Sequence, residues 1–172
     1  MTHFPLFLKM DGFVLLVGEG PESDYKLDRL KLFGAEVRRL KTLTEADLEP
    51  RPLMVVAGDL SMEENEYISA LCMERHIPVN IVDVPQLCSF YFPAIIRNGA
   101  LTVAISTDGK SPAAAVLMKQ RMAQLVPDHS GEIVDWLASL RGRYNGKILK
   151  AAAVRAFDLD RPLTEGELNE LL

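Results

Sequence analysis

The first half of the chain alternates short apolar runs with stretches of helical periodicity. Phe13–Val17 is continuously apolar and ends at Gly18, a pattern typical of a strand buried on both faces of a parallel sheet. Apolar side chains then recur at three- and four-residue steps over residues 22–33, and Gly34 follows as a helix stop signal. The same patterns predict strands at residues 13–17, 36–40, 53–57, 79–82 and 101–106.

Helical periodicity continues through the rest of the chain. Ser61 is a candidate N-cap, and the glutamates that follow it favour a helix that extends to about residue 76. Over residues 111–140 the periodicity is nearly continuous apart from a break at Pro127, and a final short helix is expected at residues 163–172.

Strands that alternate with helices at this spacing predict an α/β fold with a doubly wound parallel sheet. The helical half follows without a further strand. We therefore expect a first domain at residues 1–96, a linking segment at residues 97–112 and a helical domain at residues 113–172.

The composition is that of a globular protein, and it disfavours some partners. Among 172 residues there are 19 Lys and Arg against 24 Asp and Glu, and the resulting net charge of −5 disfavours general nucleic-acid binding. The apolar runs are far shorter than the roughly 20 residues of a membrane span, and no signal peptide is readable, so we expect a cytoplasmic protein without membrane partners. Cys72 and Cys88 fit neither a disulfide framework nor a zinc pattern, and no metal ligands are assigned.

A glycine-rich turn follows the first predicted strand and opens a helix. Residues 18–23 have the spacing G-x-G-x-x-S, which permits a tight turn and lets backbone N–H groups approach a pyrophosphate. Pro21 removes one donor, and two glutamates place negative charge beside the turn. A tight turn without a ligand explains the pattern as well. The candidate cofactor-binding residues are Gly18, Gly20, Pro21, Glu22, Ser23, Thr42 and Leu43.

Basic residues stand where a dinucleotide site normally has an acidic residue for the ribose. Arg38, Arg39 and Lys41 lie at the end of the second predicted strand. They suit the 2′-phosphate of NADP, or they are the exposed face of an edge strand. The sequence leaves both interpretations open.

Asp83 directly follows the predicted strand at residues 79–82. Ligands of open α/β sheets usually bind outside the carboxyl ends of the strands, and a carboxylate there can accept a proton or meet a metal ion. The alternative is an Asp that forms a turn by bonding its own backbone before Pro85.

A set of ordered motifs, densest between residues 80 and 112, covers residues 4 to about 145. They are Phe4-Pro5-Leu6-Phe7-Leu8, Val17-Gly18-x-Gly20, Lys26, Asn80-Ile81-Val82-Asp83-x-Pro85, Ser89-Phe90-x-x-Pro93-Ala94-Ile95-Ile96, Leu101-x-Val103-Ala104-Ile105-Ser106-x-x-Gly109-x-Ser111-Pro112, Pro127-x-His129-x-Gly131 and Leu140-Arg141-x-Arg143. In these motifs the chain resembles the precorrin-2 dehydrogenase / sirohydrochlorin ferrochelatase family, which includes the N-terminal module of bacterial siroheme synthase.

The resemblance implies a homodimer with a Rossmann-like NAD(P)-binding half, a central dimerisation segment that exchanges strands and a helical C-terminal half. It also implies NAD-dependent oxidation of precorrin-2 to sirohydrochlorin, insertion of ferrous iron as a substrate to give siroheme, or both. Asp83 matches the family's key carboxylate, to which general-base or metal-delivery roles are assigned.

The resemblance further implies that the loop after the strand at residues 101–106 lies near the carboxylates of the bound tetrapyrrole. Together with the N-terminus of the following helix, this loop could bind propionate and acetate groups, or it is a polar loop that only caps the helix. His129 matches a family histidine, for which packing or capping is the simpler role. The candidate substrate-binding residues are Ser106, Thr107, Lys110 and Ser111.

The chain departs from the family around the cofactor. Only residues 41–52 join the second and third predicted strands, which is too short for the further strand and crossover of the family. With Pro21 and the missing ribose acid, this predicts weak binding of NAD or NADP, or its loss, whereas chelation requires no nicotinamide. The alternatives are a non-catalytic carrier or regulatory protein that binds a tetrapyrrole or nucleotide, and a nucleotide-binding module unrelated to tetrapyrroles.

Overall fold

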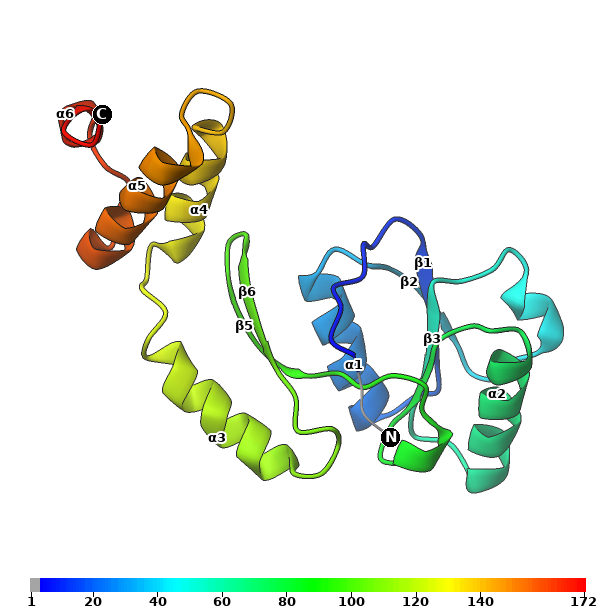
Figure 1. Cartoon of the computed structure of the whole chain (residues 1–172). Coiled ribbons are helices and arrows are strands. Elements are labelled where there is room, and N and C mark those ends of the chain that lie inside the picture. The colour runs from blue at the N-terminus through cyan, green and yellow to red at the C-terminus, as the bar shows by residue number, and fades with distance from the viewer. Residues whose placement is uncertain (1–3) are drawn as a thin grey trace. The chain divides into compact units, whose positions relative to one another are not determined.

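A computed structural model describes residues 4–172 of the chain. The chain divides into a first unit that ends at Phe92 and a second unit at Pro93–Leu172 (Figure 1). Residues 1–3 lie outside the described residues. They begin the predicted first domain and the N-terminal segment in which no signal peptide is expected. No helix at residues 4–172 is long and apolar enough to cross a membrane.

The first unit contains a four-stranded, fully parallel sheet in the order β2-β1-β3-β4, which confirms the predicted α/β class. The central strands β1 and β3 are buried along their whole length, as their apolar sequences predict. The strands are β1 (Phe13–Val17), β2 (Glu36–Leu40), β3 (Met54–Ala57) and β4 (Val79–Ile81).

Helices cover both faces of this sheet. Leu30 of α1 (Pro21–Leu32) packs with Val14 and Leu16 on one face, whereas Ile68 of α2 (Met62–Glu74) packs with Leu15 on the other. Side chains alternate between the faces of a strand, so β1 contributes to both cores. The predicted N-cap of α2 is confirmed, because Ser61 and Glu64 form a reciprocal capping box.

The connection between β2 and β3 contains no further strand, as the sequence predicts from the small number of residues that join them. It contains one 3-10 turn, η1 (Glu45–Leu48), and Leu48 anchors that turn in the core. β3 pairs directly with β1, so no further strand lies between them among the described residues.

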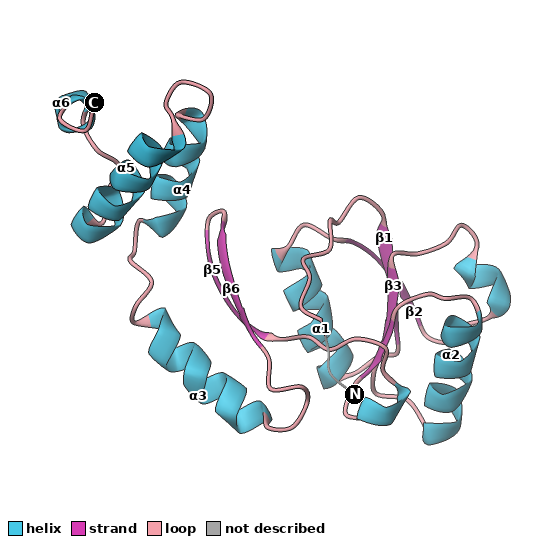
Figure 2. Ribbon diagram, viewed as in Figure 1, coloured by secondary structure: helices cyan, strands magenta, loops and turns pink. Residues whose placement is uncertain are grey.

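The second unit combines a hairpin with helices (Figure 2). β5 (Ala94–Asn98) and β6 (Leu101–Ile105) form a two-stranded antiparallel sheet, of which the sequence patterns predict only β6. The periodic stretch at residues 111–140 forms two helices, and a further helix, α5, lies outside the predicted elements. The helices are α3 (Pro112–Ala123), α4 (Ser130–Ser139), α5 (Gly146–Leu159) and α6 (Glu165–Asn169).

The hairpin turn is attached to the start of α4. The Asn98 side chain accepts a hydrogen bond from the Gly131 backbone N–H at 3.1 Å and donates one to the Asp128 carbonyl at 2.7 Å. Gly99 approaches Gly131 so closely that a Cβ on Gly99 would lie 2.8 Å from the Gly131 Cα. Both glycines are therefore required for this contact between backbones.

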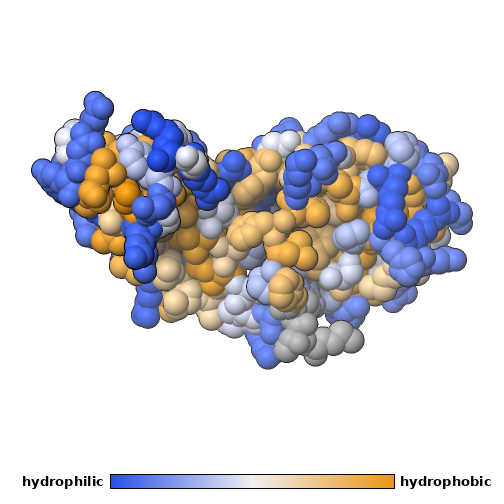
Figure 3. Space-filling view, turned by 45° about the horizontal axis from the view of Figure 1, so that its top comes forward, coloured by the Kyte–Doolittle hydropathy of each residue, from blue (hydrophilic) through white to orange (hydrophobic). Residues whose placement is uncertain are grey.

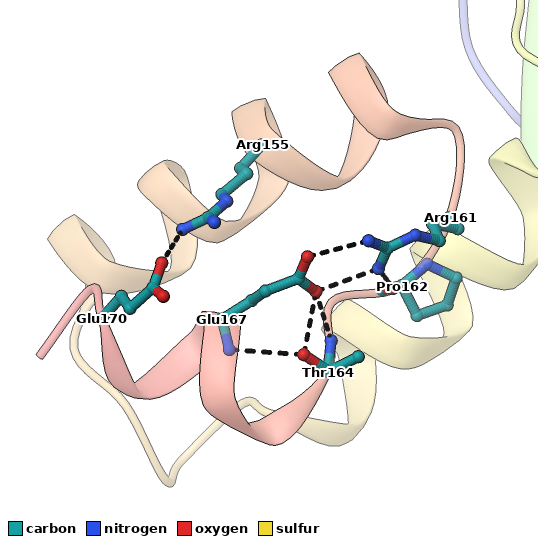
Figure 4. Close-up of polar contacts among 6 residues, drawn as sticks. All are labelled: Arg155, Arg161, Pro162, Thr164, Glu167 and Glu170. Carbon is teal, nitrogen blue, oxygen red and sulfur yellow. Dashed lines mark hydrogen bonds and ion pairs between the residues drawn. The ribbon is translucent and has the colours of Figure 1, made fainter.

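A network of polar contacts fixes α6 after α5 (Figure 4). The Glu167 carboxylate accepts two hydrogen bonds from the Arg161 guanidinium, at 2.8 and 2.9 Å, and further bonds from the Thr164 backbone N–H and hydroxyl. These contacts hold the pKa of Glu167 well below its usual range. Arg155 and Glu170 add an ion pair between α5 and α6 at 2.7 Å.

Glu167→Gln is expected to lower the melting temperature near neutral pH, because Gln keeps the shape but loses the charge-assisted bonds. A carboxyl group with a lowered pKa in the folded state stabilises the protein above its ordinary value of 4.5, and this contribution is lost as pH falls through the folded pKa. The difference in melting temperature between wild type and variant should therefore shrink below about pH 4.5. Calorimetry at several pH values measures this difference. A difference that does not change with pH would contradict the stabilising role of the Glu167 carboxylate.

Apolar side chains reach the surface on the face drawn in Figure 3, where orange areas lie among blue ones. In α3, Val116, Leu117 and Met118 are between 42% and 51% exposed. No residue of either hairpin strand is fully buried in the single chain. A two-stranded sheet is marginally stable by itself, so this hairpin requires further packing.

Candidate functional site

The carboxyl ends of the parallel strands meet at one edge of the four-stranded sheet. β1, β3 and β4 lead there into the glycine-rich turn at residues 18–23, the loop that contains Gly58 and Asp59, and the turn at Asp83. Open α/β sheets bind their ligands outside this edge. The candidate site of the first unit is therefore built from these three connections.

Gly18 is required because the turn after β1 passes directly against the loop after β3. Its φ is +109°, and a Cβ at this position would overlap the Gly58 carbonyl oxygen. The buried Ser23 hydroxyl donates a hydrogen bond to the same carbonyl at 3.0 Å. The small Ser at the third place of the motif thus ties α1 to the loop after β3.

Asp59 caps the N-terminus of α1 from the neighbouring loop. Its carboxylate accepts a hydrogen bond from the Ser23 backbone N–H at 2.8 Å. Bonds to Ser23, the largest cause, hold the pKa of Asp59 below its usual range. A Cβ on Gly20 would lie 2.5 Å from the Asp59 Cγ, so Gly20 makes room for the carboxylate.

Asp59 is a site residue that the sequence patterns do not predict. The contact joins residues 36 positions apart, and the only local signal is a Gly-Asp pair after an apolar strand. Asp83 also follows an apolar strand, but there a proline two residues later strengthens the signal.

The basic residues of β2 are paired with acidic and backbone groups of the same unit. Arg39 donates to the Gly18 carbonyl at 2.9 Å and to the Asp24 carboxylate at 2.7 Å, which fastens β2 to α1. Arg38 bonds Glu36 and covers the Phe13 ring at 3.8 Å. Lys41 lies 3.3 Å from the Glu19 carboxylate and balances the charge beside the glycine turn.

The two candidate cofactor residues beyond β2 differ in their surroundings. Leu43 is 6% exposed and packs in the core on the α2 face of the sheet. Thr42 is exposed beside it. Of these two residues, only Thr42 therefore presents its side chain at the surface.

Asp83 occupies an unusual backbone conformation after β4. Its φ is +60°, in the left-handed region that Asp tolerates better than most side chains. The turn is held by Cys88, whose thiol donates to the Ile81 carbonyl at 3.2 Å and accepts the Ile81 N–H at the same distance. The Asp83 carboxylate is exposed and makes no hydrogen bond or ion pair within residues 4–172. The turn therefore does not use the Asp83 side chain as a hydrogen-bond partner.

A second charged group, Lys26, lies near Asp83. The Lys26 ammonium sits 4.8 Å from the centre of the Phe92 ring, and Phe92 packs edge-to-face on Phe90 at 5.4 Å. Burial lowers the pKa of Lys26, and the charge of Asp83 acts in the opposite direction. Within the described chain, Lys26 has no hydrogen bond or ion pair, so its charge remains available to an anionic ligand.

The four candidate substrate residues of the second unit are brought together in one turn between β6 and α3. The Thr107 hydroxyl accepts from the Ser111 backbone N–H at 3.1 Å and donates to the Ser111 carbonyl at 3.0 Å. Ser111 caps α3 by accepting the Ala114 N–H at 3.2 Å. Ser106 accepts the Asp108 N–H, and Lys110 is exposed at the tip of the turn.

His129 is engaged with Asp160 at the end of α5. Its Nδ1 lies 3.2 Å from one carboxylate oxygen, and its backbone N–H donates to the other at 2.9 Å. The Asp160 carboxylate raises the pKa of His129. Across residues 4–172, no group of three or more His, Cys, Asp or Glu is arranged to hold a metal ion.

Comparison with known proteins identifies the class of the first unit. Residues 38–94 match the family model described as putative NAD(P)-binding. Residues 98–125 match the model described as the sirohaem biosynthesis protein central region. The parallel sheet with its glycine turn and the first match define an α/β domain of the NAD(P)-binding class.

Curated relatives are similar along the whole chain. The siroheme synthases of Psychrobacter sp. (strain PRwf-1) and Thioalkalivibrio sulfidiphilus are each 32% identical to it, over 100% and 96% of this chain and 39% of their own length. The chain therefore belongs to the siroheme synthase family, the family that the motifs indicated. It spans about two fifths of the length of these curated relatives.

A solved structure supports the architecture. The structure of SirC, precorrin-2 dehydrogenase, superposes with a TM-score of 0.71 and covers 98% of this chain and 96% of its own. At 18% sequence identity, this likeness establishes the fold.

Proposed function

We propose that this protein acts in siroheme biosynthesis on a tetrapyrrole substrate, as precorrin-2 dehydrogenase, as sirohydrochlorin ferrochelatase or as both. The observation that carries the proposal is the exposed Asp83 carboxylate, free of intramolecular bonds among the described residues, at the carboxyl end of β4 in a member of this family. A carboxylate that only formed a turn would bond its own backbone.

Asp83 is proposed as the group that accepts protons from the macrocycle. Insertion of a metal ion requires two pyrrole protons to leave, and a positioned carboxylate can receive them. Ferrous iron enters this scheme as a substrate. Lys26 supplies positive charge in the same unit for a substrate that carries many carboxylates.

The turn at residues 106–111 is proposed to bind acidic side chains of the substrate in the second unit. The Lys110 ammonium and the start of α3 suit carboxylates, and the Ser111 cap fixes where that helix begins. The Thr107 hydroxyl is already engaged on both sides by Ser111, so its part is to hold the turn.

The glycine turn fits a bound pyrophosphate poorly in this structure. Gly18, Gly20 and Ser23 supply the close packing that such a site needs. The Ser23 N–H at the start of α1, however, is bonded to the Asp59 carboxylate. In the proposed chelatase reaction, the roles of Asp83 and Lys26 do not depend on a nicotinamide.

Titration with sirohydrochlorin tests the substrate class. The purified protein is expected to shift the absorption band of the macrocycle with saturation at a fixed stoichiometry, whereas a Lys26→Met variant should bind it less tightly. Lys31→Met, which changes an exposed lysine in the last turn of α1, is the matched control. A wild-type protein that leaves the spectrum unchanged would argue against a tetrapyrrole substrate.

The protein is also proposed to be a homodimer. Among the described residues, the hairpin β5–β6 pairs with no other strand and contains no fully buried residue. The segment from Tyr91 to Val103 is largely apolar. A partner chain that extends this sheet by exchanged strands would bury both edges.

Sedimentation equilibrium is expected to give about twice the 19.1 kDa chain mass at micromolar concentration. Dilution should dissociate the dimer together with the loss of helical signal from the second unit. A monomer that remains folded throughout this range would contradict the proposed exchange.

A further inference from the structure

The backbone donors in the first turn of α1 are engaged by groups of this chain. Pro21 has no N–H, and the Ser23 N–H bonds the Asp59 carboxylate at 2.8 Å. The Glu22 N–H also acts on this carboxylate and contributes to lowering its pKa. The Asp24 N–H already bonds the Gly20 carbonyl at 2.9 Å within the helix. These are the groups that a helix N-terminus offers to phosphates in dinucleotide-binding folds.

The backbone of the loop after β3 places the Asp59 carboxylate at the start of α1. Asp59 adopts a φ of +59°, directly after the Gly58 carbonyl that Ser23 fastens. Gly20 leaves room for the carboxylate, because any larger side chain would overlap it. The Asp59 backbone and the α1 donors are thus arranged for each other.

The charges around the glycine turn also disfavour the binding of a phosphate. Glu19 and Glu22 flank it; Lys41 pairs with Glu19, and Lys26 lies near Glu22. An incoming pyrophosphate would therefore meet the negative charge of Asp59, which already occupies the Ser23 N–H that could otherwise bind the phosphate.

We propose that Asp59 is an internal substitute for the dinucleotide phosphate, which closes the glycine turn of this chain and sets its affinity for NAD and NADP. The inference rests on the proposed function only in that the domain belongs to a dinucleotide-dependent family. A dinucleotide binds here only after Asp59 leaves the start of α1. Proton and metal transfer at Asp83 use none of these groups, so they are independent of Asp59.

The decisive variant is Asp59→Asn. Asparagine tolerates the same backbone conformation and can still accept one N–H, so the fold is retained, but the negative charge is removed. We expect calorimetric titration to show NAD or NADP binding at least about tenfold tighter than in wild type, because charge-assisted bonds to the phosphate replace those to Asp59. Asp59→Gly, which frees the Ser23 N–H, should bind at least as tightly. Glu63→Gln, an exposed neutralisation in the first turn of α2, is the control and should change nothing.

Three outcomes would overturn the inference: micromolar binding of either dinucleotide by wild type, equal affinities of wild type and both Asp59 variants, or no measurable binding by any of them. Thermal melts of each variant show that the fold is retained. Sirohydrochlorin titration in parallel separates this inference from the proposed function. Retained macrocycle binding with unchanged dinucleotide affinity refutes the role of Asp59 alone, whereas loss of macrocycle binding in wild type refutes the proposed function.

Discussion

Asp83→Asn is expected to lower the rate of metal insertion into sirohydrochlorin about 10² to 10⁴-fold, the range typical of positioned acid–base groups. The amide has the shape of the carboxylate and tolerates the left-handed conformation at φ +60°. The fold and the affinity for the macrocycle should therefore change little. The measurement is the initial rate of cobalt or iron insertion, followed by absorbance, with precorrin-2 oxidation in the presence of NAD as a second assay.

Asp28→Asn is the matched control for this experiment. Asp28 lies on the exposed side of α1 in the same unit, so the variant repeats the change in net charge away from the sheet edge. It should keep wild-type rates. An active protein in which Asp83→Asn keeps full activity would remove Asp83 from the catalytic role and leave a structural turn in its place.

Gly18→Ala is expected to destabilise the first unit by about 3 kcal/mol or more. The φ of +109° is unfavourable for any side chain, and the added methyl group would overlap the Gly58 carbonyl oxygen. Relief requires the turn after β1 to move away from the loop after β3, which also breaks the Ser23 and Asp59 contacts. Urea denaturation followed by circular dichroism measures the loss.

Gly34→Ala separates the cost of a positive φ from the cost of the overlap with a neighbouring atom. Gly34 also has a positive φ, at +73°, but a Cβ there would meet no atom within 4 Å. This variant should lose only the backbone preference, about 1 kcal/mol. Equal losses at both positions would mean that the close approach of Gly18 to Gly58 contributes nothing.

The parallel sheet could be predicted from the sequence because its central strands are apolar on both faces. Phe13–Val17 and Glu36–Leu40 have the same bounds in the structure as in the sequence prediction, and Ser61 caps its helix as expected. β5 could not be predicted in this way because its five residues follow Pro93 and contain Arg97 and Asn98, which weaken the strand pattern.

Helix α5 escapes prediction for a different reason. Its buried residues Ala152 and Ala156 lie four positions apart and alanine favours helices, so the amphipathic pattern is present in the sequence and was missed. Lys147 and Lys150 at its start have the pattern of a basic cluster at a helix end. The packing of α4 against α5 cannot be inferred from local periodicity.

The candidate site was only partly accessible to sequence reasoning. Asp83 could be found because a strand end and a proline mark its position. Asp59 could not, because its role depends on a contact with Ser23 across the sheet edge. The basic residues after β2 were ambiguous for the same reason, and the pairing of Arg39 with Gly18 and Asp24 forms only once α1 lies against β2.

Turnover of a tetrapyrrole by the wild-type protein tests the central proposal most directly. Purified protein is supplied with sirohydrochlorin and ferrous or cobaltous ion, without NAD, and metal insertion is followed by absorbance against a reaction without protein. We expect a rate that is saturable in sirohydrochlorin, exceeds the uncatalysed rate and is independent of added NAD. Tight binding of the macrocycle without turnover, both here and in precorrin-2 oxidation with NAD, would contradict the enzymatic proposal and identify a carrier instead.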